Sequence, residues 1–319
     1  MIQRPLPSTL LLTLALVGCP AAKPAPPKAD NTTPPPASTG QPASPTPAAP
    51  TGASSNTITV KGSDTMVLIA QRWAETYMNA HKEVSIQVTG GGSGTGIAAI
   101  IDGTCNIADA SRPMKPAEIA KAKSNGKEIV EHKVALDALC IVVNPKNPIN
   151  ELSVAQLKGL FSGAITDWGS VGGTSGAVTI YSRESSSGTY DFVKEHILGD
   201  ADYSPKAQTL SGTAAILNAI AKDPSSIGYG GAAYFATHPE VKILGVKTDK
   251  GATAVNPVSG GKLDEQVVRS MTYPISRYLY CYTAGEPTGP IKAYLDWIVS
   301  DEGQKLVREL EYVPLTDVK

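Results

Sequence analysis

From residue 56 onward, short runs rich in β-branched residues alternate with segments of helical periodicity, and this alternation restricts the fold more than any other feature of the chain. Such alternation is typical of an α/β protein with a mainly parallel sheet covered by helices. Strands are expected over 57–61, 84–89, 106–108, 138–143, 178–182, 227–229 and 278–283. Helices are expected over 65–80, 94–102, 115–124, 153–161, 189–198, 213–222 and 290–300, with another after residue 301.

Two apolar runs, 138–143 and 278–283, are candidate connections between two α/β units. The first opens a second set of elements, and the second leads into the C-terminal helices. We therefore expect two lobes joined by two strand-like crossovers, with 56–141 plus 279–319 as the first lobe and 142–278 as the second. A cleft between lobes is a common place for a small ligand. A hinge is expected near Cys140 and Tyr280.

The N-terminus has the pattern of an export signal. Arg4 precedes an apolar run over 10–17 that is too short to span a bilayer, and Leu16-Val17-Gly18-Cys19 resembles a bacterial lipobox. In such signals the Cys carries the lipid. We expect a signal peptide over 1–18 and lipid attachment at Cys19; the alternative is an ordinary secretory signal with an incidental Cys.

Residues 19–55 have the composition of a disordered tether. Eleven of the 25 prolines lie between residues 20 and 50, among Ala, Ser, Thr and Gly and with almost no large apolar side chain. Such a segment cannot bury enough surface to offset its ordering entropy. After a lipidated Cys it would hold a folded domain away from a membrane.

The folded part carries a slight negative charge. The whole chain has a formal charge of −1, and Arg4, Lys23, Lys28 and Asp30 are the only charged residues before residue 56, so residues 56–319 carry −3. This argues against nucleic-acid binding. An anion would have to be held by local hydrogen-bond geometry rather than by a positive field.

The cysteines and histidines do not predict a cofactor. Cys105, Cys140 and Cys281 leave one thiol over in any pairing, and Cys140 with Cys281 is the pair that could form because both lie in apolar strand-like runs. Buried unpaired Cys is the favoured alternative. No metal-ligand spacing is present among Cys and His. We therefore expect neither a metal nor a cofactor.

Hydroxyl side chains, most of them with Gly, precede four of the expected helices. Helix N-termini offer free N–H donors and a partial positive charge, and Gly lets a ligand approach the backbone. Four such turns could converge on one tetrahedral oxyanion. The turns are Gly62-Ser63-Asp64-Thr65, Gly90-Gly91-Gly92-Ser93-Gly94-Thr95-Gly96, Ala110-Ser111-Arg112-Pro113 and Ser185-Ser186-Ser187-Gly188-Thr189.

Each turn taken alone is explained by helix capping, because Ser, Thr and Asp are preferred N-caps. Two arginines shift the interpretation toward an anion site: Arg183 lies four residues before Ser187, and Arg112 follows Ser111. A guanidinium offers a planar fork of donors that suits phosphate or sulfate. Ser211-Gly212-Thr213 has no such Arg and is interpreted as a helix cap.

Known enzyme loops do not fit the same segments. Gly96 is followed by Ile97 and Ala98 where a Walker A loop needs Lys-Ser/Thr, and the dinucleotide fingerprint lacks its third Gly. Ser93 has Thr95 where a hydrolase elbow needs Gly. Catalysis therefore has little support, and the chain is predicted not to be an enzyme.

Six motifs in order over residues 57–315 resemble the phosphate-binding protein family of the Pst-type ABC transporter. The most diagnostic is Arg-x-x-x-Ser-Gly-Thr at 183–189, paired with Gly-Ser-Gly-Thr-Gly at 92–96. The others are Gly62 to Met66, Ile107 to Pro113, Leu160 to Trp168 and Ile227 to Tyr229. The resemblance implies a two-lobe periplasmic-binding-protein fold with two crossovers (type II).

The resemblance also implies a ligand set. Thr65 would give its hydroxyl, Met66 its N–H and Ser93 a donor from the second helix. Arg183 would pair with phosphate from the other lobe. The set of phosphate ligands is Asp64, Thr65, Met66, Ser93, Ser111, Arg183, Ser187, Gly188 and Thr189, with Ser63, Gly94 and Arg112 as further candidates.

One departure from the family pattern concerns the proton of bound phosphate. Many members carry a site Asp where this chain has Ser111-Arg112, and that Asp accepts the phosphate proton, which sulfate lacks. A buried acceptor facing an unprotonated anion is repulsive, so it rejects sulfate. We hypothesise that Asp64 takes this role; Asp109 is the other nearby carboxylate, and a helix N-cap or a partner of Arg112 is the alternative role for Asp64.

Together these features predict a lipid-anchored extracytoplasmic receptor at the cell envelope, monomeric, that closes around inorganic phosphate and hands it to membrane permease subunits. The first alternative is the same fold binding another oxyanion, such as sulfate or molybdate. The second is a secreted phosphatase or esterase that uses Ser187 or Ser93, although no base accompanies either. The third is a surface sensor or adhesin.

Overall fold

The described part of the chain comprises residues 56–248 and 251–316 of a computed structural model. The signal peptide expected over 1–18, the lipid attachment at Cys19 and the tether up to residue 55 lie outside these residues. Within the described ranges, every helix is too short or too polar to span a bilayer.

The first lobe is built on three parallel strands with helices between them. β1 pairs with β2 and with β3 in parallel register, and β13 then pairs antiparallel with β3. The elements are β1 (Thr57–Gly62), α1 (Val67–Ala80), β2 (Ser85–Thr89), α2 (Ser93–Asp102), β3 (Ile107–Ala110), α3 (Pro116–Ser124), β13 (Ser276–Ala284), α8 (Gly289–Ile298) and α9 (Asp301–Glu309).

The amphipathic stripe of α1 shows why this lobe folds as the sequence predicts. Ile69, Trp73 and Tyr77 recur at helical spacing and are all buried against strands β1 and β2 and helices α8 and α9. Trp73 also donates its indole N–H to the carbonyl of Gly303 in α9 at 2.9 Å. The helix therefore packs on the sheet by its apolar face, as expected.

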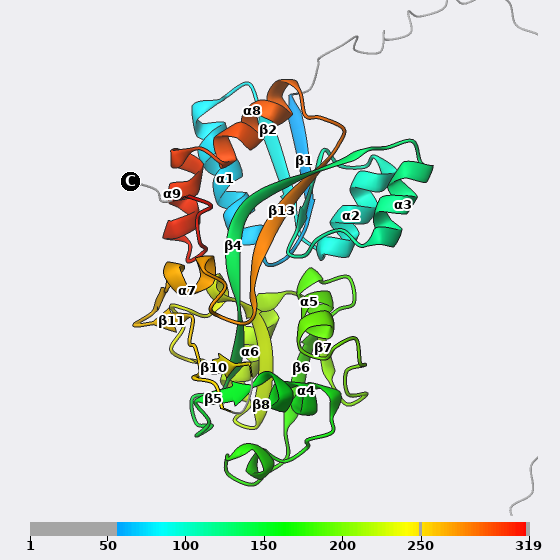
Figure 1. The fold of residues 1–319 in the computed structure, drawn as a ribbon. Coiled ribbons are helices and arrows are strands. Elements are labelled where there is room, and N and C mark those ends of the chain that lie inside the picture. Colours follow the sequence, from blue (N-terminus) through cyan, green and yellow to red (C-terminus); the bar gives the residue numbers. More distant parts are fainter. Residues whose placement is uncertain (1–55, 249–250, 317–319) are drawn as a thin grey trace, which may run out of the picture. The chain divides into compact units, whose positions relative to one another are not determined.

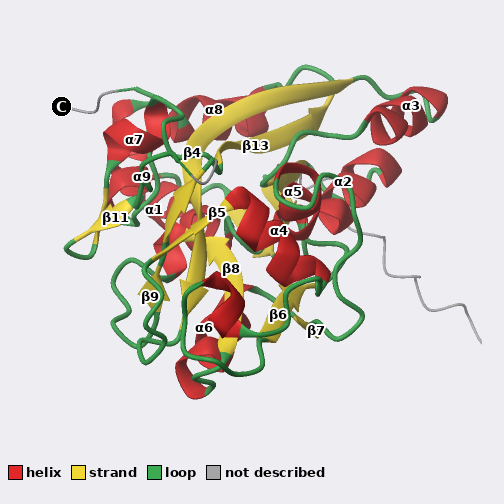
Figure 2. Ribbon diagram, turned by 60° about the horizontal axis from the view of Figure 1, so that its bottom comes forward, coloured by secondary structure: helices red, strands yellow, loops and turns green. Residues whose placement is uncertain are grey.

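The second lobe repeats the arrangement with shorter strands. β6 pairs in parallel with β8 and β7, and helices flank the strands of both lobes (Figure 2). The elements are β5 (Glu151–Ser153), α4 (Val154–Ser162), β6 (Thr179–Arg183), α5 (Gly188–His196), β7 (Gln208–Leu210), α6 (Thr213–Lys222), β8 (Ser226–Gly231), β9 (Lys242–Ile243), β10 (Gly245–Lys247), β11 (Val258–Ser259), β12 (Lys262–Leu263) and α7 (Glu265–Arg269), with 3-10 turns at Trp168–Val171 and Ala232–Tyr234.

The long strand β4 (Ile129–Val143) connects the two lobes. It pairs antiparallel with β13 over residues 129–138 and with β8 over residues 139–143, so one sheet runs in the order β2-β1-β3-β13-β4-β8-β6-β7. β4 and β13 run side by side between the two parts of the ribbon (Figure 1). Val134 and Ala135 belong to the core of the first lobe, whereas residues 138–143 belong to that of the second.

The expected strands and helices are all present, with ends that shift by a few residues, except that β4 begins nine residues earlier than the expected strand over 138–143. The sequence does not predict β5, β7, β9 to β12 and α7, each five residues or shorter. Both crossovers occur as β-structure, and the β4–β13 register is irregular at Leu279 and Tyr280.

Candidate functional site

The four turns picked out in the sequence come together between the lobes. Three of them follow the carboxyl ends of the parallel strands β1, β2 and β3, which meet at one edge of the sheet. The fourth follows β6 and begins α5, which lies beside α2 in both ribbon views (Figures 1 and 2). The N–H of Gly94 donates to the carbonyl of Ser186 at 2.9 Å, so the two helix starts touch directly.

Hydroxyl groups from opposite lobes meet at the centre of this contact. Thr65 Oγ1 lies 2.8 Å from Thr189 Oγ1, and both side chains are buried. Ser93 Oγ accepts the N–H of Ser111 at 3.0 Å and lies 3.4 Å from Ser111 Oγ. These hydroxyls can rotate to donate to an anion, because each carries one O–H that is not fixed by the backbone.

The start of α5 supplies backbone donors beside these hydroxyls. Gly188 and Thr189 are the first two residues of the helix, so their N–H groups have no acceptor within it. Ser187 Oγ accepts the N–H of Tyr190 at 3.3 Å and therefore caps the helix, while its own proton stays free to donate. Capping and anion binding are thus compatible roles for this turn.

Arg183 is the buried cation of the site. It ends β6, is 1% exposed, and donates through Nη1 to Thr213 Oγ1 at 2.9 Å and through Nη2 to Asp64 Oδ2 at 2.7 Å. Its Nε is buried with no hydrogen-bond partner among the described residues. Burial lowers the pKa of Arg183, and the charge of Asp64 opposes this. A buried N–H without an acceptor points to a ligand oxygen at this position.

Asp64 links the two lobes. Besides the ion pair with Arg183, its Oδ1 accepts the N–H of Gly91 at 2.8 Å and its backbone carbonyl accepts the hydroxyl of Tyr234 at 2.8 Å. Arg183 and Tyr234 belong to the second lobe. Asp64 therefore fixes the Gly62–Thr65 turn, which we call the first ligand turn, against the guanidinium of the opposite lobe. Its side chain does not cap α1.

Of three further candidates, Met66 and Arg112 take other partners, whereas the side chain of Ser63 does not. The N–H of Met66 donates to the carbonyl of Ser63 at 3.0 Å. Arg112 pairs with Glu118 through two nitrogens and with Asp191 of the second lobe at 2.8 Å, so its guanidinium is engaged by carboxylates. Ser63 Oγ is buried with no partner among the described residues and stays available.

Asp109 lies apart from these donors. Its Oδ1 accepts the thiol of Cys281 at 3.2 Å across the β3–β13 pair, and burial raises the pKa of Asp109 to about 7 while this hydrogen bond opposes the shift. Its backbone carbonyl accepts the N–H of Ser63. Asp109 thus supports the first turn through its backbone, with its side chain held by Cys281.

Sequence reasoning missed a buried ion pair next to the site. Asp137 in β4 and Arg277 in β13 face each other across the strand pair, with Arg277 Nη2 2.7 Å from Asp137 Oδ2 and 3.4 Å from Thr65 Oγ1. The interpretation of Ser211-Gly212-Thr213 as a side-chain helix cap is wrong: the N-cap of α6 is Gly212, without a side-chain cap, and Thr213 Oγ1 accepts from Arg183 instead. A lone Asp within the apolar run 134–143 is the signal that could have indicated a hidden cation.

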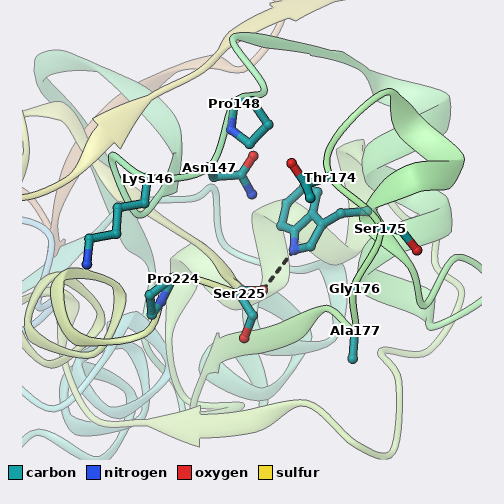
Figure 3. A pocket seen from close by; sticks show the side chains of 10 residues that line it. Lys146, Asn147, Pro148, Thr174, Ser175, Gly176, Ala177, Pro224 and Ser225 are labelled. Carbon is teal, nitrogen blue, oxygen red and sulfur yellow. Dashed lines mark hydrogen bonds between the residues drawn. The ribbon is translucent and has the colours of Figure 1, made fainter.

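The three cysteines and a separate pocket lie outside the cluster of hydroxyl and N–H donors between the lobes. Cys105, Cys140 and Cys281 are buried free thiols, and the described residues contain no group that could hold a metal. A pocket of about 330 Å³ on the second lobe is lined by residues such as Lys146 and Ser225 (Figure 3). The buried Trp168 donates its indole N–H to the carbonyl of Ser225 at 2.9 Å and is part of the structural framework.

Comparisons with known proteins agree with this geometry. The family model described as a PBP superfamily domain matches residues 46–302. The Phosphate-binding protein PstS of Pseudomonas aeruginosa is 33% identical over 281 residues, covering 83% of this chain and 84% of that protein. PstS of Bacillus subtilis is 32% identical over 267 residues, covering 83% of each.

Solved structures give the same picture. A Clostridium perfringens protein described as a phosphate ABC transporter substrate-binding protein with bound phosphate has a TM-score of 0.71 at 26% identity, covering 82% of this chain and 100% of that one. An ABC-type phosphate transport receptor from Vibrio cholerae has a TM-score of 0.64 at 25% identity, covering 80% and 99%. The two-lobe fold of these proteins is the one expected here.

Proposed function

The chain belongs to the PstS family of phosphate-binding proteins, within the PBP superfamily, and from this we propose that it captures inorganic phosphate outside the cytoplasm and delivers it to the permease of a Pst-type ABC transporter. One observation carries the proposal: the buried Nε of Arg183 has no partner among the described residues, and Nη2 of the same guanidinium contacts Asp64 in the Gly62–Thr65 turn of the opposite lobe. A tetrahedral anion supplies the missing acceptors.

Binding proceeds by closure of the lobes. Neither lobe alone surrounds the anion, since Thr65, Ser93 and Ser111 come from one and Arg183 with residues 187–189 from the other. Closing them replaces the water around phosphate with fixed donors on all sides, which restores the hydrogen bonds that dehydration removes. Hinge rotation takes place in β4 and β13, near Cys140 and Tyr280.

The proposed ligands are the hydroxyls of Thr65, Ser93, Ser111, Ser187 and Thr189, the guanidinium of Arg183 and the N–H groups of Gly188 and Thr189. Asp64 belongs to the site as the partner of Arg183. The donors of Met66, Gly94 and Arg112 have other partners in the structure. They contribute to binding only if phosphate displaces these partners.

Asp64 also accepts the proton of phosphate in this proposal, because each carboxylate oxygen has a second lone pair beyond the one used by Gly91 or Arg183. Asp64→Asn should therefore weaken phosphate binding by about tenfold or more and reduce the preference for phosphate over sulfate. Competition calorimetry measures both quantities. Unchanged affinity together with unchanged preference would show that Asp64 is not an acceptor.

The proposal includes where the receptor is located and how it is built. The protein is a monomer with one lobe over 56–141 plus 279–319 and the other over 142–278, and it catalyses no reaction. A lipid on Cys19 anchors it at the cell envelope. The mass of the N-terminal peptide of the mature protein tests the lipid. The partner on the membrane is the permease that receives phosphate.

The proposed function is tested by titrating the purified protein with phosphate, sulfate and molybdate in a calorimeter. Phosphate should bind with 1:1 stoichiometry and displace the other two anions. Stronger binding of sulfate or molybdate would assign the same fold to another oxyanion. No binding of any of them would exclude the receptor role and favour a sensor or adhesin that kept the fold.

A further inference from the structure

A second pair of arginine and aspartate, Arg277 with Asp137, lies beside the proposed anion site. Arg277 donates to Asp137 Oδ2 through Nε at 3.0 Å and through Nη2 at 2.7 Å. The side chains are 2% and 0% exposed, so the pair is more deeply buried than Arg183 with Asp64. It sits on β4 and β13, the two strands that join the lobes.

Each member of this pair has one polar atom without a hydrogen-bond partner among the described residues. The atoms are Arg277 Nη1 and Asp137 Oδ1, a donor and an acceptor. Burial raises the pKa of Asp137, and Arg277 together with the nearby backbone N–H of Ala232 opposes this rise. Leaving such atoms unpaired in a buried position costs free energy, and folded proteins rarely do so. An ion pair that served only to hold two strands together would be expected to satisfy both groups.

Arg277 and Asp137 lie next to the hydroxyl groups of the proposed anion site. Arg277 Nη2 lies 3.4 Å from Thr65 Oγ1, which itself lies 2.8 Å from Thr189 Oγ1. The guanidinium stands 5.3 Å from the ring centroid of Phe192 in α5. A Cβ on Gly231 would lie 3.0 Å from Thr65 Cγ2 and 3.1 Å from Asp137 Oδ1, so the free oxygen is close to the first ligand turn.

We propose that Asp137 and Arg277 determine oxyanion specificity, with Asp137 Oδ1 accepting a hydrogen bond from a protonated phosphate oxygen and Arg277 Nη1 donating to a neighbouring one. The inference rests on the proposed phosphate-binding function. Asp137 is then a second acceptor besides Asp64. Each proton of a singly or doubly protonated phosphate therefore has a carboxylate to accept it.

The charges explain how such a site selects its ligand. Two Arg–Asp pairs bring two cations and two anions, so they add no net charge, and binding depends on matching donors to acceptors. A protonated oxyanion satisfies Asp137 Oδ1, whereas sulfate presents a lone pair to a carboxylate lone pair in a buried position. The pair therefore penalises sulfate without weakening phosphate.

The test uses calorimetric titration of the full chain and its variants with phosphate, arsenate and sulfate. Arsenate has the shape and the protons of phosphate, and sulfate has the shape alone. Asp137→Asn should weaken phosphate and arsenate by about tenfold to a hundredfold and should leave sulfate unchanged or tighter. Arg277→Lys, which removes the Nη1 donor and keeps the charge, should weaken all three anions alike.

Asp109→Asn is the matched control, because Asp109 is also a buried strand carboxylate but is held by Cys281. It should leave the ratio of phosphate to sulfate affinity unchanged. Thermal unfolding without ligand reports the structural part of each effect. If Asp137→Asn does not fold, the double variant Asp137→Asn with Arg277→Gln removes both charges, and its affinity ratio is measured instead.

If Asp137→Asn changed the affinities for phosphate, arsenate and sulfate by the same factor, Asp137 would have a purely structural role, and that result would overturn the inference. A protonated Asp137 would give this same result, because its carboxyl group could donate to phosphate and to sulfate alike. The ratio of phosphate to sulfate affinity would then not depend on Asp137. Failure of the wild-type chain to bind phosphate would be a different result, because it would refute the proposed function itself.

Discussion

Replacing Arg183 by glutamine should weaken phosphate binding at least about a hundredfold, corresponding to about 3 kcal/mol. The guanidinium is 1% exposed, and it supplies the unpaired Nε donor and the ion pair to Asp64. Without it, the anion loses its buried countercharge from the second lobe and faces Asp64 with no cation between them. Calorimetry at constant pH and ionic strength measures the loss.

The phosphate affinity of Arg183→Lys should lie between those of the wild type and Arg183→Gln. Lysine keeps the charge but cannot contact Asp64, Thr213 and the anion with one planar group of donors. Arg72→Gln is the matched control: Arg72 is half exposed on α1 and pairs with Glu75 at the surface. If Arg183→Gln bound phosphate like this control while remaining folded, the anion site would have to lie elsewhere.

The motif around Arg183 could be predicted from sequence because its determinants are local. Arg183, Ser187 and Thr189 have a fixed spacing within one strand, turn and helix start, so their types and order already indicate a cluster of donors. The same applies to Thr65 and Ser93, each at the start of a helix after a parallel strand. Short-range geometry places all of these side chains at one edge of a sheet.

The partners of these residues could not be predicted in the same way, because they depend on strand register. Asp137 and Arg277 are 140 residues apart and meet only because β4 and β13 pair as they do. The expected strand over 138–143 begins one residue after Asp137, because Asp137 and the polar run Glu131-His132-Lys133 interrupt the apolar pattern in the first half of β4. The hidden ion pair was missed with it.

The role of Arg112 shows the opposite failure. Its position directly after Ser111 favoured an anion contact, but Glu118 lies one helical turn into α3 and Asp191 approaches from α5, and together they hold the guanidinium. A local motif cannot reveal a competing carboxylate from another lobe. The spacing from Arg112 to Glu118 was visible in the sequence, whereas the contact to Asp191 required the folded arrangement.

Gly188→Ala should hold the lobes apart and weaken phosphate binding by about a hundredfold or more, because it lowers the population of the closed state. A Cβ at this position would lie 2.3 Å from Ser93 Oγ and 2.8 Å from Ser111 Oγ, both from the opposite lobe. Within its own lobe the change is favourable, since Gly188 begins α5 and alanine has the higher helix propensity. The variant should therefore be folded but populate the closed state rarely, and the apparent affinity falls with that fraction.

Solution scattering separates closure from direct contact with the anion. Phosphate should make the wild type more compact, whereas Gly188→Ala should keep the dimensions of the free protein at the same phosphate concentration. Gly176→Ala is the control, because the nearest atom to its Cβ, the carbonyl of Thr174, is 4.0 Å away in the same lobe. If Gly188→Ala became compact with phosphate but bound it weakly, the methyl group would be displacing the anion rather than holding the lobes apart. If the wild type did not change its scattering with phosphate, hinge closure itself would be refuted, and the contacts between Thr65 and Thr189 would have to exist before the ligand arrives.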